Sequence, residues 1–448
     1  MHDPQRLSPA DAGLLALEQR RRMPLHAGVV ALFDGDAPAL GELLERVRTR
    51  LALVPRYRRS VVTVPFGQGR PRWAEDPAFS LEHHVRATAL PGGAGENELM
   101  ALASHLLERP LERARPLWEL WLVESLAGGR FALIAKTHAA LIDGDGNRDL
   151  LAVLFDGGGA PAVPGRSPGP PPPALALLLE ALAERATSPR EAFESARLLG
   201  GRAREELRWR ELDLLERLGA PPASRLNTRS GSHRRFAFLD AGLKGARRAK
   251  ERLGGTLNDV ILTAVAGALG RYLDEHGEDT DGLLLRALVP LADAGSGRLL
   301  ASYAPLPVGI EDPRRRHAEI SRALDGLRAS GRARAASELL DAEGLAAASV
   351  LARAARLTAS HHAFNVAIAN VPGPQTPLRL LGHELRAVYP ALPLVRNQAL
   401  SIAVVSYAGR LCFGLLADYD AVGDLERLAA LLKESLRELP KAPLKRPR

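Results

Sequence analysis

The sequence contains little cysteine, few aromatic residues and no long apolar run. Its 448 residues include a single cysteine, Cys412, so no disulfide can form within the chain, as is typical of proteins in a reducing compartment. Aromatic residues make up 4%, so Leu, Ala and Val must fill the interior. No uninterrupted apolar stretch approaches the ~20 residues that a spanning helix needs, and the N-terminus lacks an apolar signal core. With 46% hydrophobic residues, these features predict a globular protein of the cytoplasm.

A surplus of positive charge is the second bulk feature. Lys and Arg number 60 against 52 for Asp and Glu, a formal net charge of +8. Three interpretations stay open: solvated surface charge, attraction to an anionic membrane face, and binding of the phosphates of a CoA thioester. Nucleic-acid binding is not expected, because no supporting fold motif is present. The basic residues cluster at 20–22, 56–59, 314–316 and 441–448.

Strand and helix patterns alternate along both halves of the chain, which predicts an α/β or α+β fold with two lobes. The composition changes to Gly and Pro after the first third, and residues 168–173 predict an extended linker. We therefore expect a first lobe over 1–155, a linker with a helical bridge over 156–224, and a second lobe over 225–448.

Local patterns predict the individual elements. Pro290 is expected to close a strand, and Thr256 to Asp259 to cap a long apolar helix that runs to Leu273. Helices are predicted between Ser8 and Pro24 and over 39–53, 98–109, 147–155, 174–219, 243–253, 317–329, 335–357 and 425–439. Strands are predicted over 29–33, 61–64, 72–73, 83–86, 115–123, 131–135, 234–239, 283–289, 302–308, 364–371, 399–406 and 411–416.

One stretch, Lys136–Gly144, concentrates the polar groups that could carry chemistry. The apolar run 131–135 predicts a buried strand that leads to His138. Imidazole titrates near neutral pH, so a histidine at a strand end is a candidate general base for a hydroxyl or an amine. The alternative is a histidine that only satisfies a polar turn. Asp143 either orients the histidine or, with Gly144, holds the turn.

This stretch resembles the HHxxxDG signature of CoA-dependent acyltransferases, in particular the bacterial wax ester synthase/diacylglycerol acyltransferase family. With Asp143 and Gly144 as the anchor, His138 matches the first histidine, and Ala139 stands where the second would carry the chemistry. Further blocks resemble the family in the same order over both lobes: 7–11, 24–26, 76–86, 115–119, 257–260, 370–374, 398–402 and 413–420.

The resemblance implies a two-lobe chloramphenicol-acetyltransferase-like fold, shared with condensation domains, with the signature loop in a tunnel between the lobes. It implies an acyl-CoA-dependent O-acyltransferase that transfers a long-chain fatty acyl group to diacylglycerol or a fatty alcohol. Such a protein would work at the inner face of the membrane or at a lipid droplet. Acyl-CoA would be a substrate, with no cofactor and no metal. His138 and Asp143 would be catalytic, while Asn258 and Gly144 would contact substrate, although Asn258 equally suits a helix N-cap.

Three departures from the family pattern favour a weakened or lost activity. Ala139 replaces the base, Ala369 replaces a serine, and the short Gly-rich segment 293–300 stands where the family carries a Gly-Asn pair. Loss of a general base costs ~10²–10⁴-fold in rate, so a slow enzyme remains physically allowed. A non-catalytic protein that binds acyl-CoA, lipid or a partner protein, and a transferase with an amine acceptor, also stay open. His138 can replace the base only if a slip or bulge re-aims it, because neighbouring strand residues face opposite sides.

Overall fold

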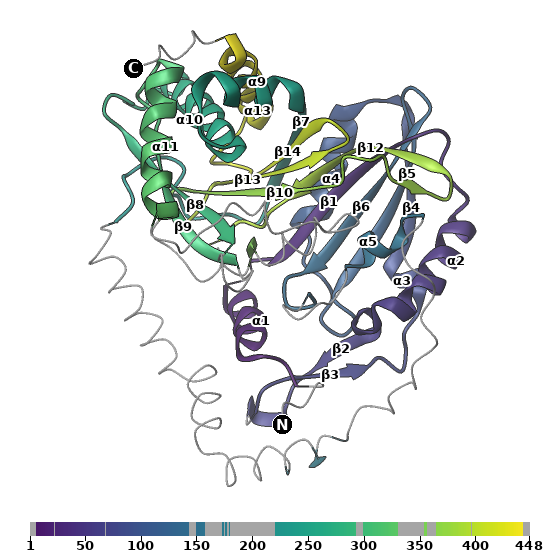
Figure 1. The fold of residues 1–448 in the computed structure, drawn as a ribbon. Helices are drawn as coiled ribbons and strands as arrows, with labels where there is room; N and C mark the ends of the chain where they lie inside the picture. Colours follow the sequence, from purple (N-terminus) through teal and green to yellow (C-terminus); the bar gives the residue numbers. More distant parts are fainter. Residues whose placement is uncertain are drawn as a thin grey trace.

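The computed structural model describes residues 6–21, 23–67, 69–142, 149–156, 220–292, 299–329, 364–395 and 397–441, with a few isolated positions elsewhere. These residues form two lobes, each built on a six-stranded sheet with helices packed against it (Figure 1). The predicted two-lobe fold of mixed strands and helices is therefore confirmed. The Pro-rich linker, the helical bridge and the helix predicted over 335–357 fall almost wholly outside the described residues.

The first sheet has the strand order β11-β12-β1-β6-β5-β4. Its central strand β6 pairs antiparallel with β1 on one side and β5 on the other, so β6 is buried almost throughout. The strands are β1 (His26–Asp34), β4 (Val85–Ala94), β5 (Trp118–Leu126), β6 (Arg130–His138), β11 (Arg379–Leu380) and β12 (His383–Ala391). The helices of this lobe are α1 (Pro9–Arg21), α2 (Leu40–Arg50), α3 (Leu81–His84), α4 (Glu96–Glu108) and α5 (Leu150–Leu154).

A separate two-stranded ribbon, β2 (Arg59–Val62) with β3 (Arg72–Glu75), lies at the periphery beyond α1 (Figure 1). Short 3-10 helices flank it: η1 (Leu51–Leu53), η2 (Pro55–Arg58) and η3 (Pro65–Gly67).

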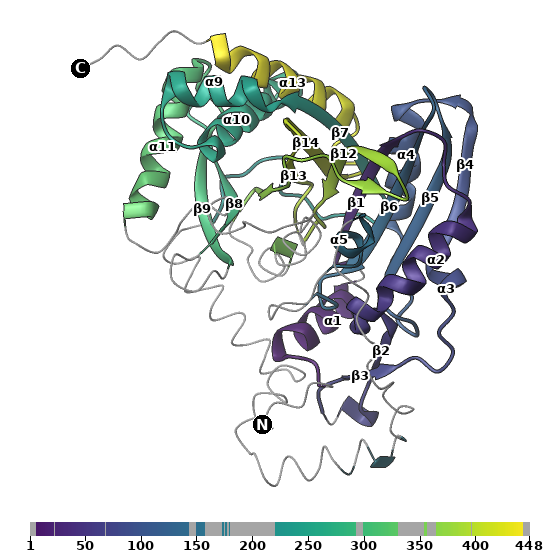
Figure 2. The same ribbon diagram turned by 45° about the vertical axis from the view of Figure 1, so that its right-hand side comes forward.

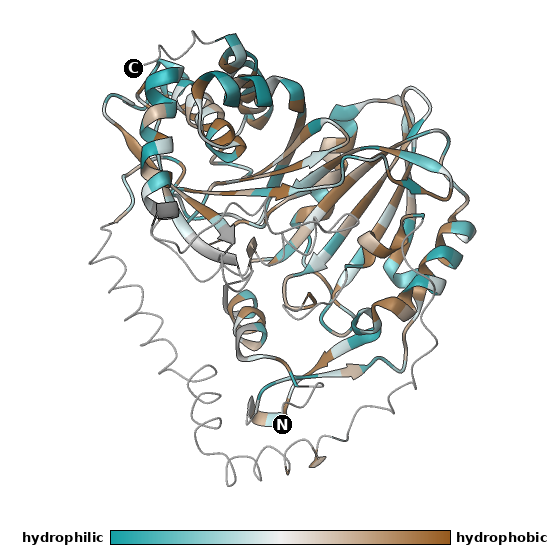
Figure 3. Cartoon of the chain, in the orientation of Figure 1, coloured by the Kyte–Doolittle hydropathy of each residue, from teal (hydrophilic) through white to brown (hydrophobic). Residues whose placement is uncertain are grey.

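The second sheet has the order β7-β14-β13-β10-β8-β9, and its helices gather on one side of it (Figure 2). The strands are β7 (Arg234–Gly242), β8 (Leu284–Ala292), β9 (Leu299–Pro307), β10 (Val366–Pro372), β13 (Leu400–Tyr407) and β14 (Arg410–Asp418). The helices are α9 (Leu243–Leu253), α10 (Leu257–Glu275), α11 (Pro313–Ala329) and α13 (Leu425–Glu438), followed by η5 (Leu439–Lys441). Apolar residues follow the strands of both sheets in Figure 3, as expected for a core between layers.

Helix α10 begins where the sequence predicts. The hydroxyl of Thr256 accepts the backbone N–H of Asp259 at 3.3 Å, and the Asp259 carboxylate accepts the backbone N–H of Thr256 at 2.9 Å. This reciprocal pair satisfies two of the free N–H groups at the helix start. Thr256 is therefore the N-cap, and the alternative assignment of that role to Asn258 is wrong. Among the described residues no single helix has both the length and the hydropathy of a membrane span. Helices α9 and α10 meet these two criteria only when they are taken together, and the chain bends by 98° between them.

Two local predictions are wrong. Strand β8 continues through Pro290 to Ala292, because its parallel pairing with β10 extends only to Leu288 and leaves the proline outside that ladder. Residues 83–84 end a single helical turn, α3, instead of beginning a strand. His84 supports the fold: its ring stacks on Trp118 with centroids 4.5 Å apart.

The two lobes share a strand. β12, from the second half of the chain, pairs antiparallel with β1 and completes the first sheet, a crossover that the sequence did not predict. Apolar contacts strengthen this junction: the rings of Phe238 on β7 and Tyr389 on β12 stack with centroids 4.0 Å apart. Gly414 on β14 lies directly against the carbonyl of Pro390 on β12. The lobes therefore form one frame around the end of β6.

Candidate active site

The side chains in the first half of β6 alternate between two apolar clusters. Phe131 and Leu133 belong to one cluster, which also contains Ala139 and residues of β10 and β13 from the second lobe. Ala132 and Ile134 belong to the other, which contains α4. The pairing of β6 with β1 runs without a bulge to the last pair, in which His138 faces His26. The slip that would turn His138 to the face of position 139 does not occur.

The imidazole of His138 is committed to its own turn. Its side chain is 1% exposed, and Nδ1 accepts the backbone N–H of Ala140 at 3.0 Å. A nitrogen that accepts a hydrogen bond carries no proton, so the proton of the neutral ring lies on Nε2. Nε2 lies 3.5 Å from Oε2 of Glu18 on α1. The lone pair that a general base would use is therefore occupied by Ala140.

Glu18 is the buried carboxylate that faces this ring, and the sequence analysis did not identify it. Its Oε1 accepts the backbone N–H of Leu25 at 3.1 Å, and its Oε2 accepts a hydrogen bond from the Arg113 guanidinium at 2.8 Å. Burial opposes the charge, but the contacts with His138, Leu25 and Arg113 outweigh it and lower the pKa of Glu18 to about 2. A glutamate in an otherwise apolar stretch of α1 was the signal that could have marked it.

This low pKa predicts an acid-sensitive contribution of Glu18 to stability. The carboxylate stabilises the fold fully above its ordinary pKa of 4.5, and the contribution is lost as the pH falls towards 2. Between pH 7 and pH 3 we expect the wild type to lose about 2 kcal/mol more of its free energy of unfolding than Glu18→Gln does. Urea unfolding at both pH values measures this difference. Glu45→Gln, at an exposed acid, serves as the control and should follow the wild type; equal losses in wild type and Glu18→Gln would contradict the assignment.

Position 139 offers no polar atom from its side chain. Ala139 is 0% exposed and lies in the same apolar cluster as Ala369 of β10, which is 1% exposed. Ala369 stands where the family pattern has a serine. Two of the three departures noted in the sequence thus fall within one buried apolar cluster that spans both lobes. The third, 293–300, lies almost wholly outside the described residues.

The other predicted site residues are not brought to His138 by the described part of the chain. Asp143 and Gly144 lie outside it. Asn258 is the second residue of α10 and is buried. This helix packs on α9, α11, α13 and β9 in the second lobe. The catalytic role of Asp143 and the substrate contacts of Asn258 and Gly144 therefore stay predictions.

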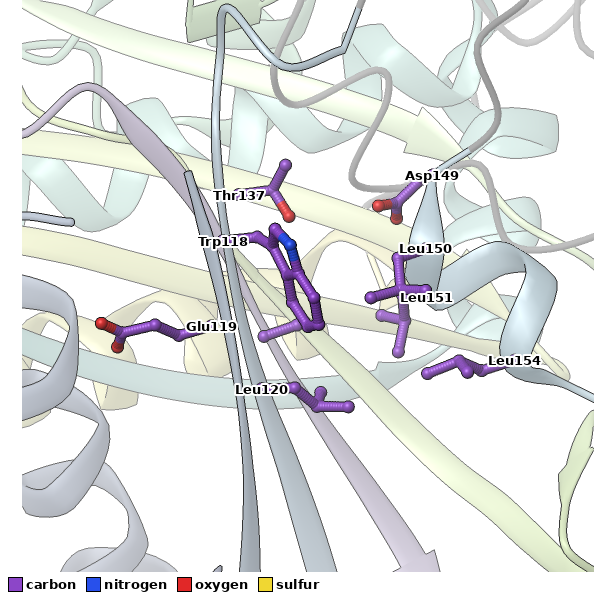
Figure 4. Close-up of a pocket in the computed structure, with 9 residues that line it drawn as sticks. Trp118, Glu119, Leu120, Thr137, Asp149, Leu150, Leu151 and Leu154 are labelled. Atoms are coloured by element: carbon purple, nitrogen blue, oxygen red, sulfur yellow. The ribbon is translucent and has the colours of Figure 1, made fainter. Parts of the chain in front are cut away.

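A small cavity of about 10 Å³ lies beside the end of β6, between the sheet and α5. Figure 4 shows Thr137 of β6 and Asp149, the N-cap of α5, at the same end of this cavity, with Trp118 and leucines along the rest. Asp149 is 2% exposed, and its Oδ1 accepts the Tyr57 hydroxyl at 2.7 Å. Burial raises the pKa of Asp149 to about 6, although the hydrogen bond from Tyr57 and the nearby backbone N–H groups of Leu151 and Leu150 lower it. The sequence analysis missed this residue, whose only sequence signal is its place before an apolar helix.

Family models account for most of the chain. The wax ester synthase/diacylglycerol acyltransferase catalytic domain matches residues 7–261, and the WS/DGAT C-terminal domain matches residues 298–440. The chain belongs to the wax ester synthase/diacylglycerol acyltransferase family. The protein tgs2 from Mycobacterium tuberculosis, named a probable diacylglycerol O-acyltransferase, is 34% identical over 465 residues, which cover 97% of this chain and 99% of that one. A second, tgs1 from the same species, is 29% identical over 448 residues, with 97% and 95% covered.

Solved structures agree with this membership. The wax ester synthase/diacylglycerol acyltransferase from Marinobacter aquaeolei VT8 has a TM-score of 0.68 at 26% identity, with 97% of this chain and 98% of that one covered. The first condensation domain of the calcium-dependent antibiotic synthetase has a TM-score of 0.56 at 16% identity, which shows a shared fold alone. The chain is thus a WS/DGAT acyltransferase family member whose second signature position is a buried alanine.

Proposed function

We propose that this chain transfers a long-chain fatty acyl group from CoA to the hydroxyl of diacylglycerol or of a fatty alcohol, at a rate reduced by the alanine at position 139. The observation that supports this is the family pattern over both lobes, with the strand, turn and apolar frame around position 139 retained. The proposed activity is the one for which the relatives of this chain are named.

The chemistry makes modest demands on the protein. The site must orient thioester and alcohol, accept the hydroxyl proton and stabilise the tetrahedral oxyanion, and no covalent enzyme intermediate is needed. Orientation and oxyanion contacts do not depend on residue 139. A missing base therefore predicts a turnover ~10²–10⁴-fold lower than with histidine, well above the uncatalysed reaction.

The test is an assay of the purified full chain with long-chain acyl-CoA and either diacylglycerol or a fatty alcohol. We expect slow ester formation above a blank without protein. An amine acceptor is included, because an unprotonated amine is already a nucleophile and depends less on a base. Transfer to the amine alone would replace the alcohol in the proposal, and no ester or amide above the blank would end it.

A second candidate function is a non-catalytic protein that binds acyl-CoA, lipid or a partner protein. The buried pair Ala139 and Ala369 favours it, because both positions have lost polar groups in the same apolar cluster. Titration with a non-hydrolysable acyl-CoA separates the two functions when combined with the assay. Tight binding without turnover supports the second, and turnover supports the first.

We further propose a peripheral site of action at the inner face of the membrane. Residues 55–75, around the β2–β3 ribbon, contain five arginines and one acidic residue, Glu75, which lies 3.9 Å from Arg59. Arg70 is buried, and the other arginines are not. Phe66 in the turn of this ribbon is 86% exposed. Cationic residues beside an exposed aromatic ring suit an anionic lipid surface. Sedimentation with vesicles of anionic and of neutral lipid tests this placement, and equal binding to both would contradict it.

A further inference from the structure

The face of β6 that should carry the base still borders an ionisable group. Strand β6 ends at His138, but the backbone N–H of Ala139 still donates to the Leu25 carbonyl at 3.1 Å, next to the last β1–β6 pair. Ala139 lies in the apolar cluster that also contains Leu133 of β6. Thr137, two residues before Ala139, faces the same side of the sheet as Leu133. Thr137 lines the cavity that Asp149 closes at one end (Figure 4). Asp149 is thus a buried carboxylate that borders the cavity beside Thr137.

The geometry leaves one carboxylate oxygen available. Oδ1 of Asp149 accepts the Tyr57 hydroxyl, whereas Oδ2 is buried and has no hydrogen-bond partner in the part of the chain that the structure describes. A buried polar atom of this kind calls for an explanation, since most such atoms are paired with protein or water. The cavity of about 10 Å³ has room for one water molecule. The Thr137 hydroxyl, which also interacts with the Tyr57 hydroxyl, and Oδ2 of Asp149 would give that water two polar partners.

We propose that Asp149, through one water molecule held in this cavity, takes the proton of the acyl acceptor in place of the missing imidazole. This inference rests on the proposed function and names the proton acceptor of the same site. The acceptor hydroxyl gives its proton to the water as its oxygen bonds to the thioester carbonyl carbon, and the water gives a proton to Oδ2. The carbon–sulfur bond then breaks, and the CoA thiolate recovers the proton from Asp149 along the same path.

The surroundings of Asp149 suit this role. Burial raises the pKa of the carboxyl towards neutrality, where a general base is most effective. Tyr57 of η2 is the titratable group that contacts it, and its phenol stays protonated because burial raises its pKa. Glu119 of β5 also borders the cavity, but its carboxylate lies 3.5 Å from the Lys136 ammonium and points away from Asp149 in Figure 4.

The experiment measures the pH dependence of acyl transfer by the full chain. In the wild type we expect the rate to fall below about pH 6, as Asp149 takes up a proton. Asp149→Asn should lower the rate at pH 8 by about 10²-fold and abolish this acid limb. The variant should fold, because the amide keeps an acceptor for Tyr57 and removes a charge that burial disfavours. Tyr57→Phe removes the hydrogen bond that lowers the pKa of Asp149, so the limb should move to higher pH, a shift that a merely structural role would not produce.

A matched background separates this inference from the proposed function. In Ala139→His the imidazole accepts the proton, so adding Asp149→Asn should cost less than about tenfold. A wild type that is active and keeps its rate and acid limb in Asp149→Asn overturns the inference alone. Transfer by Ala139→His when the wild type shows none overturns both the inference and the proposed function of the wild type. If neither protein transfers an acyl group, both fall likewise, and the histidine at position 139 is also not the only group that this chain lacks for transfer.

Discussion

Ala139→His is expected to raise acyl transfer to diacylglycerol or a fatty alcohol by up to about 10²-fold, because a general base contributes about 10²–10⁴-fold and Asp149 already supplies about 10²-fold of it. The substitution places an imidazole in the apolar cluster that spans both lobes, whereas His138 keeps its Nδ1 bonded to Ala140. The measurement is the single-turnover rate of ester formation with long-chain acyl-CoA. Because Ala139 is 0% exposed, the larger ring should also cost about 1–3 kcal/mol of stability.

Ala140→His is the matched control for this gain. It adds the same ring one residue later, at a position that is also 0% exposed, so its packing cost should be similar. We expect no increase in rate from it. Equal rates for Ala139→His and the wild type, with both folded, would show that position 139 is not where this chain carries out its chemistry.

Gly414→Ala is expected to reduce the free energy of unfolding by about 3 kcal/mol. A Cβ atom at this position on β14 would overlap the backbone carbonyl of Pro390 on β12, and neither backbone can move without disturbing a sheet. The effect should fall on the junction of the two lobes, and acyl transfer should decline with it. Urea unfolding, followed in parallel with the transfer assay, measures both.

The control for this substitution is Gly423→Ala, where a Cβ atom would have nothing within 4 Å. Its free energy of unfolding should stay close to that of the wild type. If Gly414→Ala were as stable as the control, β12 and β14 could move apart at no cost in stability. That result would contradict the close packing of Gly414 against the Pro390 carbonyl.

Local signals predicted much of the fold, because they act over a few residues. The cap formed by Thr256 and Asp259 and the end of α9 at Gly254, where φ is 85°, follow from backbone chemistry within one turn. The hairpin of β13 and β14 follows from two alternating apolar runs around Ala408 and Gly409, both at positive φ. The alternation of side chains along the first half of β6 follows from strand geometry alone.

The long-range features could not be predicted, because their partners lie far apart in the sequence. β12 adds to the first sheet although more than 350 residues separate Gly28 from its partner Ala391, and nothing in residues 383–391 marks which sheet they join. Glu18 reaches His138 from a different element, and Asp149 acquires its raised pKa only from burial beside Tyr57. Such couplings arise from the assembled fold and leave no local pattern.

The central claim is that His138 holds the turn with the lone pair on Nδ1, so that it does not serve as the base. Nitrogen NMR of histidine-labelled protein tests this most directly, with His138→Asn identifying the signals of this ring among the 12 histidines. We predict a ring with an unprotonated, hydrogen-bonded Nδ1 and a proton on Nε2, and a shift of the Nε2 signal in Glu18→Gln. A ring with the proton on Nδ1 and a free Nε2 would contradict the account and make His138 available as the base.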